Sequence, residues 1–157
     1  MNPYLDLLNA VVDRVRAADV CSTPPAIPAF PEESEPNENR PGQGDNLEDR
    51  ISIALGKSGI VLIVYIEGVD ATEEDGDALE IRVQVVEETI KNRHPSGSQK
   101  TCWNVLIGLR AQLQNWAPEP EGSWMPFQFL GFVSVQKSNP LIREIRFRTL
   151  GYLTIDP

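Results

Sequence analysis

Two consecutive apolar segments constrain the fold of this chain more than any other feature. Residues 60–68 read IVLIVYIEG, a run that is apolar at odd and even positions alike. A strand of this kind needs cover on both of its faces, so it predicts a central strand of a sheet. Residues 79–88 read LEIRVQVVEE and alternate between apolar and polar side chains. This alternation predicts a strand with one face on a core and the other face polar.

The chain predicts two antiparallel hairpins. The acidic connection at residues 69–77 is too short for a crossover, which implies a hairpin with a protruding acidic tip. A second hairpin is predicted from strands at residues 127–137 and 141–156, joined by a turn. One face of its first strand is expected to carry Phe127, Phe129, Gly131, Val133 and Val135. One face of its second strand is expected to carry Ile142, Glu144, Arg146 and Arg148.

Two helices are predicted before the first strand. Asn2 and Pro3 form a good helix start, and apolar residues then recur at helical spacing to about residue 20. A short helix from residue 45 is expected to stop at Gly56. Its inner face would carry Ile51, Ala54 and Leu55. A strand remains an alternative here, since alternate residues from Ile51 to Leu55 are also apolar.

A third helix is predicted at residues 99–116, between the two hairpins, with Ser98 as its N-cap. Its buried face is expected to carry Cys102, Leu106, Leu109, Leu113 and Trp116, widened by Trp103 and Ile107. In contrast, residues 21–44 are rich in proline and glutamate, which predicts no regular structure. Ile27 and Phe30 are the only strong apolar anchors in that segment.

These elements predict an α+β fold with a mostly antiparallel four-stranded sheet, made from two hairpins, and helices packed on one face. The 157 residues suit a single domain. Within it we distinguish an N-terminal helix (1–20), a Pro/Glu-rich loop (21–45) and an α+β core (46–157).

The formal net charge of −9 argues against nucleic acid or an anionic membrane as the main partner, because both require clustered Lys and Arg. The charge favours solubility or contact with a basic protein surface. The N-terminus lacks the pattern of a signal peptide, and no apolar run approaches the length of a membrane span, so a cytoplasmic location is expected. Cys21 and Cys102 are too isolated to suggest a metal site or a disulfide framework.

No catalytic, cofactor or metal site is predicted. His94, the only histidine, precedes Pro95 in a loop and has no nucleophile or carboxylate at a suggestive spacing. The acidic cluster around Gly76 lacks the bidentate glutamate and flanking helices of a calcium loop. We therefore expect a protein that acts by assembly rather than as an enzyme.

The polar sheet faces are the candidate interaction site. Side chains of Glu80, Arg82 and Gln84 on one strand, and of Glu144, Arg146 and Arg148 on another, either pair across strands on a solvated face or select a partner subunit. Trp124, Met125 and Phe127, preceded by prolines, are either core anchors or an exposed docking patch. The candidate interface residues are Glu73, Glu74, Asp75, Asp77, Arg82, Glu144, Arg146 and Arg148.

Several short motifs, taken in order, resemble one family. The LEIRVQV strand is followed by a loop and by the helix VLIGLR (residues 105–110), which leads to Trp116-Ala117-Pro118. An aromatic strand FQFLG (127–131) and a final strand FRTLGY (147–152) follow. Over residues 45–156 this arrangement resembles bacteriophage tail terminators, most closely those of Mu-like contractile-tailed phages and prophages. The chain departs from the family pattern at Asn115, where a glycine would precede Trp116.

The resemblance implies a non-enzymatic structural protein without cofactors. It would form a ring with copies of itself, commonly a hexamer, cap the tail tube, end tube polymerisation and provide the surface on which the head docks. Its partners would be the tail-tube protein and head–tail connector proteins, first in the host cytoplasm and then in the virion tail. The alternatives are an intracellular protein-binding or chaperone-like α+β module, a head–tail connector or completion protein, and, third, an enzyme with its acid–base pair among the acidic residues.

Overall fold

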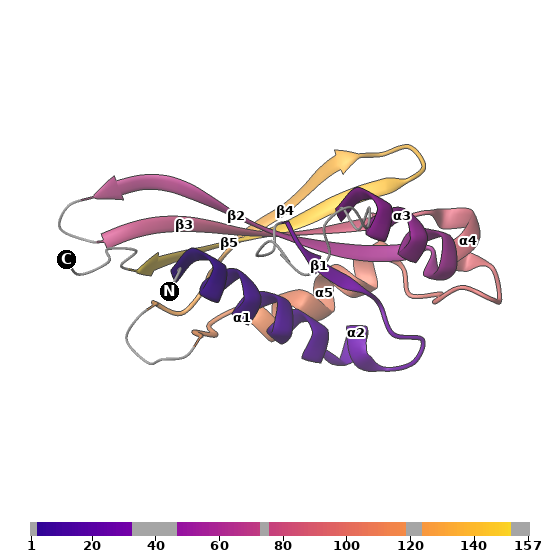
Figure 1. Ribbon diagram of the computed structural model, residues 1–157, viewed down its shortest axis with the longest axis horizontal. Helices are drawn as coiled ribbons and strands as arrows, with labels where there is room; N and C mark the ends of the chain where they lie inside the picture. The colour runs from indigo at the N-terminus through magenta and orange to yellow at the C-terminus, as the bar shows by residue number, and fades with distance from the viewer. Residues whose placement is uncertain (1–2, 33–46, 73–75, 119–123, 152–157) are drawn as a thin grey trace, which may run out of the picture.

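The structure is a computed structural model that describes residues 3–32, 47–72, 76–118 and 124–151 (Figure 1). Its centre is a five-stranded sheet in the order β1-β2-β3-β5-β4. The strands are β1 (Ala29–Pro31), β2 (Ile60–Thr72), β3 (Gly76–Glu87), β4 (Gln128–Gln136) and β5 (Leu141–Gly151). The helices are α1 (Pro3–Ala17), α2 (Asp19–Ser22), α3 (Leu47–Ser58), α4 (Thr89–Arg93) and α5 (Cys102–Leu113). None of the helices in these ranges is long and apolar enough to cross a membrane.

The predicted α+β class is confirmed, but the predicted sheet is only roughly right. Both hairpins are present, β2 with β3 and β4 with β5, and β3 pairs antiparallel with β5 between them. A fifth strand, β1, pairs in parallel with β2. It comes from the proline-rich segment for which no regular structure was expected. Three residues suffice there because prolines are tolerated in a short edge strand, and because Ile27 and Phe30 anchor the segment on the two sides of the sheet.

The helices do not all pack on one face of the sheet, contrary to the prediction. Figure 1 shows α1 and α5 on one side, which we call the inner face, and α3 on the other, the outer face. The outer side chains of β2, Val61 and Ile63, form a second small core with Ile51, Ala54 and Leu55 of α3. The apolar run of β2 is therefore covered on both faces, as predicted, and the second cover is α3.

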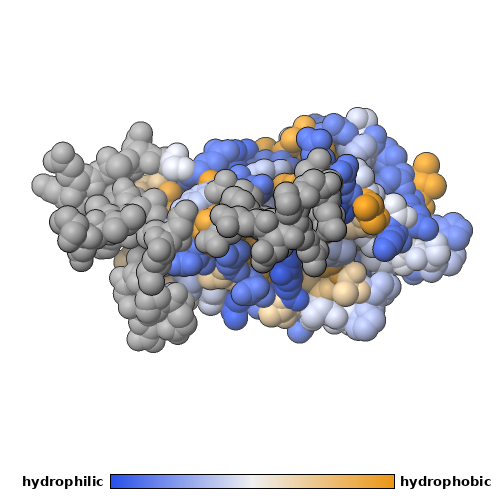
Figure 2. Space-filling model, viewed as in Figure 1, coloured by the Kyte–Doolittle hydropathy of each residue, from blue (hydrophilic) through white to orange (hydrophobic). Residues whose placement is uncertain are grey.

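The main core lies between the inner face and the helices α1 and α5. The inward side chains of β3 are those predicted, Leu79, Ile81, Val83 and Val85. From β5, Ile145 and Phe147 point the same way. Outside the atoms drawn in grey, the face seen in Figure 2 is mostly hydrophilic, with hydrophobic residues in small separate spots. Most of the large apolar side chains lie in the layers between sheet and helices.

The first hairpin is longer than predicted. Its strands pair as far as Thr72 and Gly76, so much of the expected loop is strand, with a register irregularity between Gly68 and Ala71. The tip at residues 73–75 lies outside the described residues, as does the predicted continuation of the last strand over residues 152–156. Backbone pairing therefore continues where acidic composition predicted a turn.

Several helix ends also differ from the prediction. Helix α3 continues through Gly56 and ends before Gly59, whose φ of +78° is the left-handed conformation that favours glycine. Helix α5 begins at Cys102, and its N-cap is Thr101 rather than Ser98, because the Thr101 hydroxyl accepts a hydrogen bond from the Asn104 N–H. Helix α4, five residues long, was not predicted.

Two bulges change the faces of β4. Between Phe129 and Gly131 the register with β5 shifts by one residue, and it shifts again between Ser134 and Gln136. Each extra residue reverses the alternation that follows it. Consequently Phe129 and Phe132 both pack against the inner core, whereas Val135, predicted to share a face with Phe129, is exposed.

Candidate functional site

The outer face of the sheet carries a lattice of ion pairs beyond the part that α3 covers. Arg82 on β3 lies directly opposite Arg146 on β5, and Gln84 lies opposite Glu144. On the other side of β3, Glu67 of β2 lies opposite Glu80. Arginines and carboxylates from three neighbouring strands therefore meet on one surface, because alternate residues of a strand share a face.

Each arginine of this lattice contacts more than one carboxylate. Arg82 Nε lies 3.0 Å from Glu80 Oε1, and its Nη2 lies 3.1 Å from Glu67 Oε2. Arg146 Nε lies 3.0 Å from Glu144 Oε2. Longer cross-strand contacts complete the lattice, at 3.6 Å between Arg146 and Glu80 and at 3.8 Å between Arg82 and Glu144. The carboxylates thereby separate two arginines that are direct cross-strand neighbours.

The pKa values of Arg82 in the lattice and of the neighbouring Tyr65 are both shifted. Burial alone would lower the pKa of Arg82, but the hydrogen bond and charge of Glu80, with the charges of Glu67 and Glu144, raise it overall. The pKa of Tyr65, opposite Arg82 on β2, is raised by burial and then by the charges of Glu32 and Glu144. Both groups therefore stay protonated over a wider pH range than in an unfolded chain.

The structure brings together part of the predicted interface. Arg82, Glu144 and Arg146 lie in the lattice, and they pair across strands as one of the two interpretations expected. Arg148 is exposed, and no described residue forms an ion pair with it. Asp77 pairs through its backbone with Ala71 and Gly151, and its side chain is not described. The remaining predicted residues, Glu73, Glu74 and Asp75, lie outside the described residues.

A second surface was missed. The β4–α5 surface consists of Trp103, Ile107, Arg110, Phe129, Phe132 and Arg143. Trp103 and Ile107 were expected to widen the buried stripe of α5, but they are 47% and 61% exposed. Helix α5 contacts α1, α2, β3 and β5, and its side toward β4 is only partly covered, by Phe129, Phe132 and Arg143. That prediction was wrong because an apolar stripe does not reveal how much of it the neighbouring elements cover.

Stacked aromatic rings and arginines order the β4–α5 surface. The ring centroids of Trp103 and Phe132 lie 5.5 Å apart in an edge-to-face arrangement. The guanidinium of Arg143 lies 5.2 Å from the centre of the Trp103 ring, and that of Arg110 lies 3.9 Å from the centre of the Phe129 ring. Such contacts hold exposed aromatic side chains in place and leave their outer faces free.

One signal for this surface was present in the sequence. Trp103, Ile107 and Arg110 follow one another at helical spacing, as a second stripe one residue out of step with the buried stripe. A helix with two adjacent stripes presents more apolar width than a single sheet face covers. Nearby, Trp124 and Phe127 are core anchors, as one interpretation expected, whereas Met125 is exposed.

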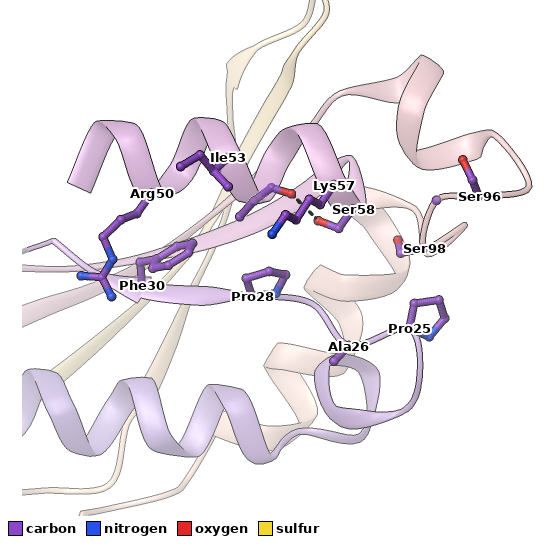
Figure 3. Close-up of a pocket in the computed structure, with 12 residues that line it drawn as sticks. Pro25, Ala26, Pro28, Phe30, Arg50, Ile53, Lys57, Ser58, Ser96 and Ser98 are labelled. Atoms are coloured by element: carbon purple, nitrogen blue, oxygen red, sulfur yellow. Dashed lines mark hydrogen bonds between the residues drawn. The ribbon is translucent and has the colours of Figure 1, made fainter. Parts of the chain in front are cut away.

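A groove of about 510 Å³ lies between α3 and the segment leading into β1 (Figure 3). Its walls include Pro28, Phe30 and Ile53, and the cations Arg50 and Lys57 lie along it. The Arg50 guanidinium lies 5.6 Å from the centre of the Phe30 ring. The groove suits an apolar group beside an anion.

A buried polar cluster lies at the end of β3. Glu87 has no exposed surface and accepts hydrogen bonds from Asn92 Nδ2 at 2.6 Å, from the Cys102 N–H at 3.2 Å and from Arg93 Nε at 3.3 Å. The Asn92 amide also donates to the Lys100 carbonyl at 2.9 Å. The bonds of this cluster connect the end of β3 to α4 and connect both to the start of α5, so we assign it a structural role.

The remaining candidates for chemistry are His94, which contacts only its own turn, and Cys21 and Cys102, whose thiols stay protonated. His94 is exposed, and its Nδ1 contacts the backbone N–H and hydroxyl of Ser96 in the same turn. Burial raises the pKa of the Cys21 thiol to about 11 and also raises that of Cys102. In the described ranges, no three His, Cys, Asp or Glu side chains are grouped to hold a metal ion.

Comparison with known proteins gives no assignment. No protein-family model matches this sequence, and no curated protein sequence matches it. The resemblance to tail terminators therefore stays a prediction that depends on the motifs alone.

Proposed function

We propose that this protein is a structural phage protein that caps the tail tube. In this proposal, copies of the chain form a ring at the head-proximal end of the tube, end tube polymerisation and provide the surface on which the head docks. The observation that carries the proposal is the ordered β4–α5 surface, where large apolar side chains are exposed on regular elements. Surfaces of this composition are typical of contacts between proteins.

The conformation of Asn115 also supports the resemblance. Its φ is +64°, in the left-handed region, immediately after α5 and before Trp116. In the tail-terminator pattern a glycine stands at this position, and glycine adopts this conformation without strain. Asparagine is among the few other residues that adopt it readily. The substitution at this position therefore preserves the local backbone geometry that the family motif needs.

The outer-face lattice suits a protein that acts by assembly. Its charges satisfy one another within the subunit, so the face presents a fixed pattern of charge rather than loose side chains. Interfaces use such patterns to select a partner and its orientation more than to supply affinity. Contacts between identical subunits that join unlike surfaces close into a ring when the rotation per subunit closes.

The test is polymerisation of a tail-tube protein from the same phage or prophage, with and without the purified chain present. We expect shorter tubes in its presence, each with a ring of extra density at one end, as measured by electron microscopy of negatively stained samples. The chain with Arg148→Glu serves as a probe of the outer face, because Arg148 is exposed. Equal tube lengths in both samples, with bare tube ends, would contradict the proposal.

The groove in Figure 3 favours a second candidate, a protein-binding module. Its apolar walls and two cations suit a partner segment that carries apolar and acidic side chains. The substitution Ile53→Glu, at an exposed position in this groove, separates the two functions. It abolishes binding by a groove-dependent module and leaves the length of capped tubes unchanged.

A further inference from the structure

We propose that the groove in Figure 3 binds a small amphipathic carboxylate, a molecule with an apolar body and a single anionic group. Pro28, Phe30 and Ile53 contact the apolar body, and Arg50 and Lys57 hold the anion. This binding site goes beyond the proposed capping function and does not depend on it.

The groove is formed by three segments that are distant in the sequence. Figure 3 draws the twelve residues that line it, which come from the described stretches 25–30, 50–58 and 96–98. Arg50 and Phe30 lie at one end, and Ser96 and Ser98 lie at the other. The volume of about 510 Å³ falls within the range of small-molecule sites, roughly 300–1,000 Å³. A small molecule placed there contacts more than one element of the fold.

An unburied apolar side chain of α3 lines this groove. Ile51, Ala54 and Leu55 pack in the small core on the outer face of β2. Ile53 belongs to neither hydrophobic core and is 60% exposed. It lines the groove together with Phe30, which is half-buried. An apolar ligand body that covers these side chains removes their surface from water, which favours binding.

The charge of the groove is positive, although the chain has a net charge of −9. None of the twelve lining residues is acidic. Arg50, Ile53 and Lys57 share one side of α3, because residues three and seven positions apart lie on the same face of a helix. Neither cation forms an ion pair with a described residue. A third cation, Lys100 Nζ, donates to the Pro25 carbonyl at 3.1 Å. A concave surface with cations alone attracts an anion.

The hydroxyl groups of the groove are already engaged within the chain. Ser58 Oγ lies 2.8 Å from the Ile60 carbonyl and 3.0 Å from the Ala54 carbonyl. Ser98 Oγ donates to the Asn92 side chain, and Ser96 Oγ contacts His94 Nδ1. A partner segment would therefore have to keep its backbone N–H and C=O groups outside the groove, where water satisfies them. A small molecule with one anionic group has no such requirement.

The first experiment compares three ligands that share an apolar chain and differ in the head group. Decanoate, decanol and decylammonium are titrated into the purified full-length chain by calorimetry, below the concentrations at which they form micelles. We expect decanoate to bind with one equivalent per chain, and decanol at least about tenfold more weakly. Decylammonium should bind more weakly than decanol, because the cations repel it. Equal affinities for the three ligands, or no binding of decanoate, would overturn the proposal.

Matched substitutions then locate the site. Ile53→Glu places a carboxylate in the groove, and we expect it to weaken decanoate binding at least about tenfold. The control is Ile107→Glu, which makes the same change on the β4–α5 surface at a side chain that is 61% exposed. It should leave decanoate binding within about twofold of the unchanged chain. Both variants should fold, because both positions are exposed. A loss of binding in Ile107→Glu alone would place the ligand on the β4–α5 surface and overturn the proposal.

The roles of the two cations are tested together. In the chain with Arg50→Gln and Lys57→Gln, decanoate should bind at least about tenfold more weakly, while the affinity for decanol should change less than about twofold. Arg148→Gln removes an exposed arginine outside the groove and should change neither affinity. If the double variant still prefers decanoate to decanol as strongly as the unchanged chain does, Arg50 and Lys57 do not hold the anion.

The chain's own acidic residues are tested as competitors for the groove. Residues 33–46 connect β1 to α3 and lie outside the described residues. They include Glu33, Glu35 and Glu38. A chain with these three residues changed to glutamine should bind decanoate within about twofold of the unchanged chain. Binding by that variant alone would show that the chain itself neutralises the groove, and the proposal would be overturned.

The outcomes separate this inference from the proposed function. Tubes that are capped by a chain with no affinity for decanoate would overturn the binding site and leave the capping function standing. Decanoate binding that Ile53→Glu removes, in a chain that leaves tube length unchanged, would support the binding site and contradict the capping function.

Discussion

Two carboxylate clusters on the same strand, β3, have opposite surroundings. At the end of β3, Glu87 points to the inner face, has no exposed surface and contacts Asn92 and the start of α5. In the middle of β3, Glu80 points to the outer face and contacts two arginines beside water. The same alternation along β3 places both carboxylates, but the elements that cover the two faces of the sheet differ.

The difference lies in what happens when one partner is removed. On the inner face water cannot replace a lost donor, so an unpaired carboxylate or amide retains its full desolvation penalty. On the outer face Arg82 and Arg146 are partly exposed, so a released arginine turns to solvent and loses little, although Glu144 itself is buried. We infer that the Glu87 cluster fixes the backbone between α4 and α5, whereas the outer lattice fixes the charge pattern that a partner meets.

The largest effect is expected from Asn92→Asp. This change keeps the shape of the side chain but places a second carboxylate against Glu87 and removes the amide that donates to Glu87 and to the Lys100 carbonyl. Because the cluster is buried, we expect a loss of about 3–5 kcal/mol in the free energy of unfolding at neutral pH. Urea denaturation followed by circular dichroism measures it.

The control for this variant is Asn9→Asp, at an exposed position of α1. It makes the same chemical change in water, and we expect the free energy of unfolding to stay within about 0.5 kcal/mol of the original. The loss in Asn92→Asp should also shrink at acidic pH, because a protonated carboxyl donates a hydrogen bond. Equal losses at the two positions would show that the Glu87 cluster is not the constraint we describe.

A smaller effect is expected at alkaline pH from Cys21, in the inner core. Burial raises the pKa of its thiol from 9.0 to about 11, so the fold favours the protonated form. Its contribution to stability is complete below pH 9.0 and is lost as the pH rises through about 11. A shift of this size corresponds to about 3 kcal/mol. We expect Cys21→Ala to lose less stability between these pH values than the unchanged chain, as measured by urea denaturation.

The Cys21 thiol on the inner face changes its charge over this pH range, in contrast to the outer lattice. The pKa of Arg82 is raised, so the lattice keeps its positive charge throughout this pH range. All other titratable groups are common to the two proteins and cancel in the comparison. If Cys21→Ala and the unchanged chain lose stability in parallel with rising pH, the thiol is not the group responsible.

Much of the fold was predictable because the alternation of apolar and polar side chains is visible within single segments of the sequence. The alternation in β3 assigns Glu80 and Arg82 to one face without knowledge of any partner strand, and β5 assigns Glu144 and Arg146 in the same way. These four residues form the lattice together with Glu67 of β2, so most of this part of the candidate site followed from pattern alone.

The elements that were missed depend on contacts between distant segments. Strand β1 exists because Ala29 lies beside Leu62, and α4 is held by Asn92 in the Glu87 cluster. A bulge in β4 also leaves no mark in the pattern, so the position of Phe132 was not predictable. The β4–α5 surface was missed for the same reason, since only the assembled sheet shows which side of α5 lacks cover.

The smallest effect is expected from Arg82→Met, which retains most of the apolar stem and removes the charge at the centre of the lattice. Arg82 is partly exposed, so we expect a loss of about 1 kcal/mol at low salt. The loss should fall further in about 1 M salt, where screening acts over about 3 Å. The control Arg148→Met removes an exposed arginine that makes no ion pair with a described residue, and it should change stability at neither salt concentration.

Asn92→Asp should respond little to salt, because its carboxylates are buried. If Arg82→Met instead destabilised the protein as strongly as Asn92→Asp, with no dependence on salt, the outer lattice would be part of the structural core, and the distinction between the two carboxylate clusters would disappear.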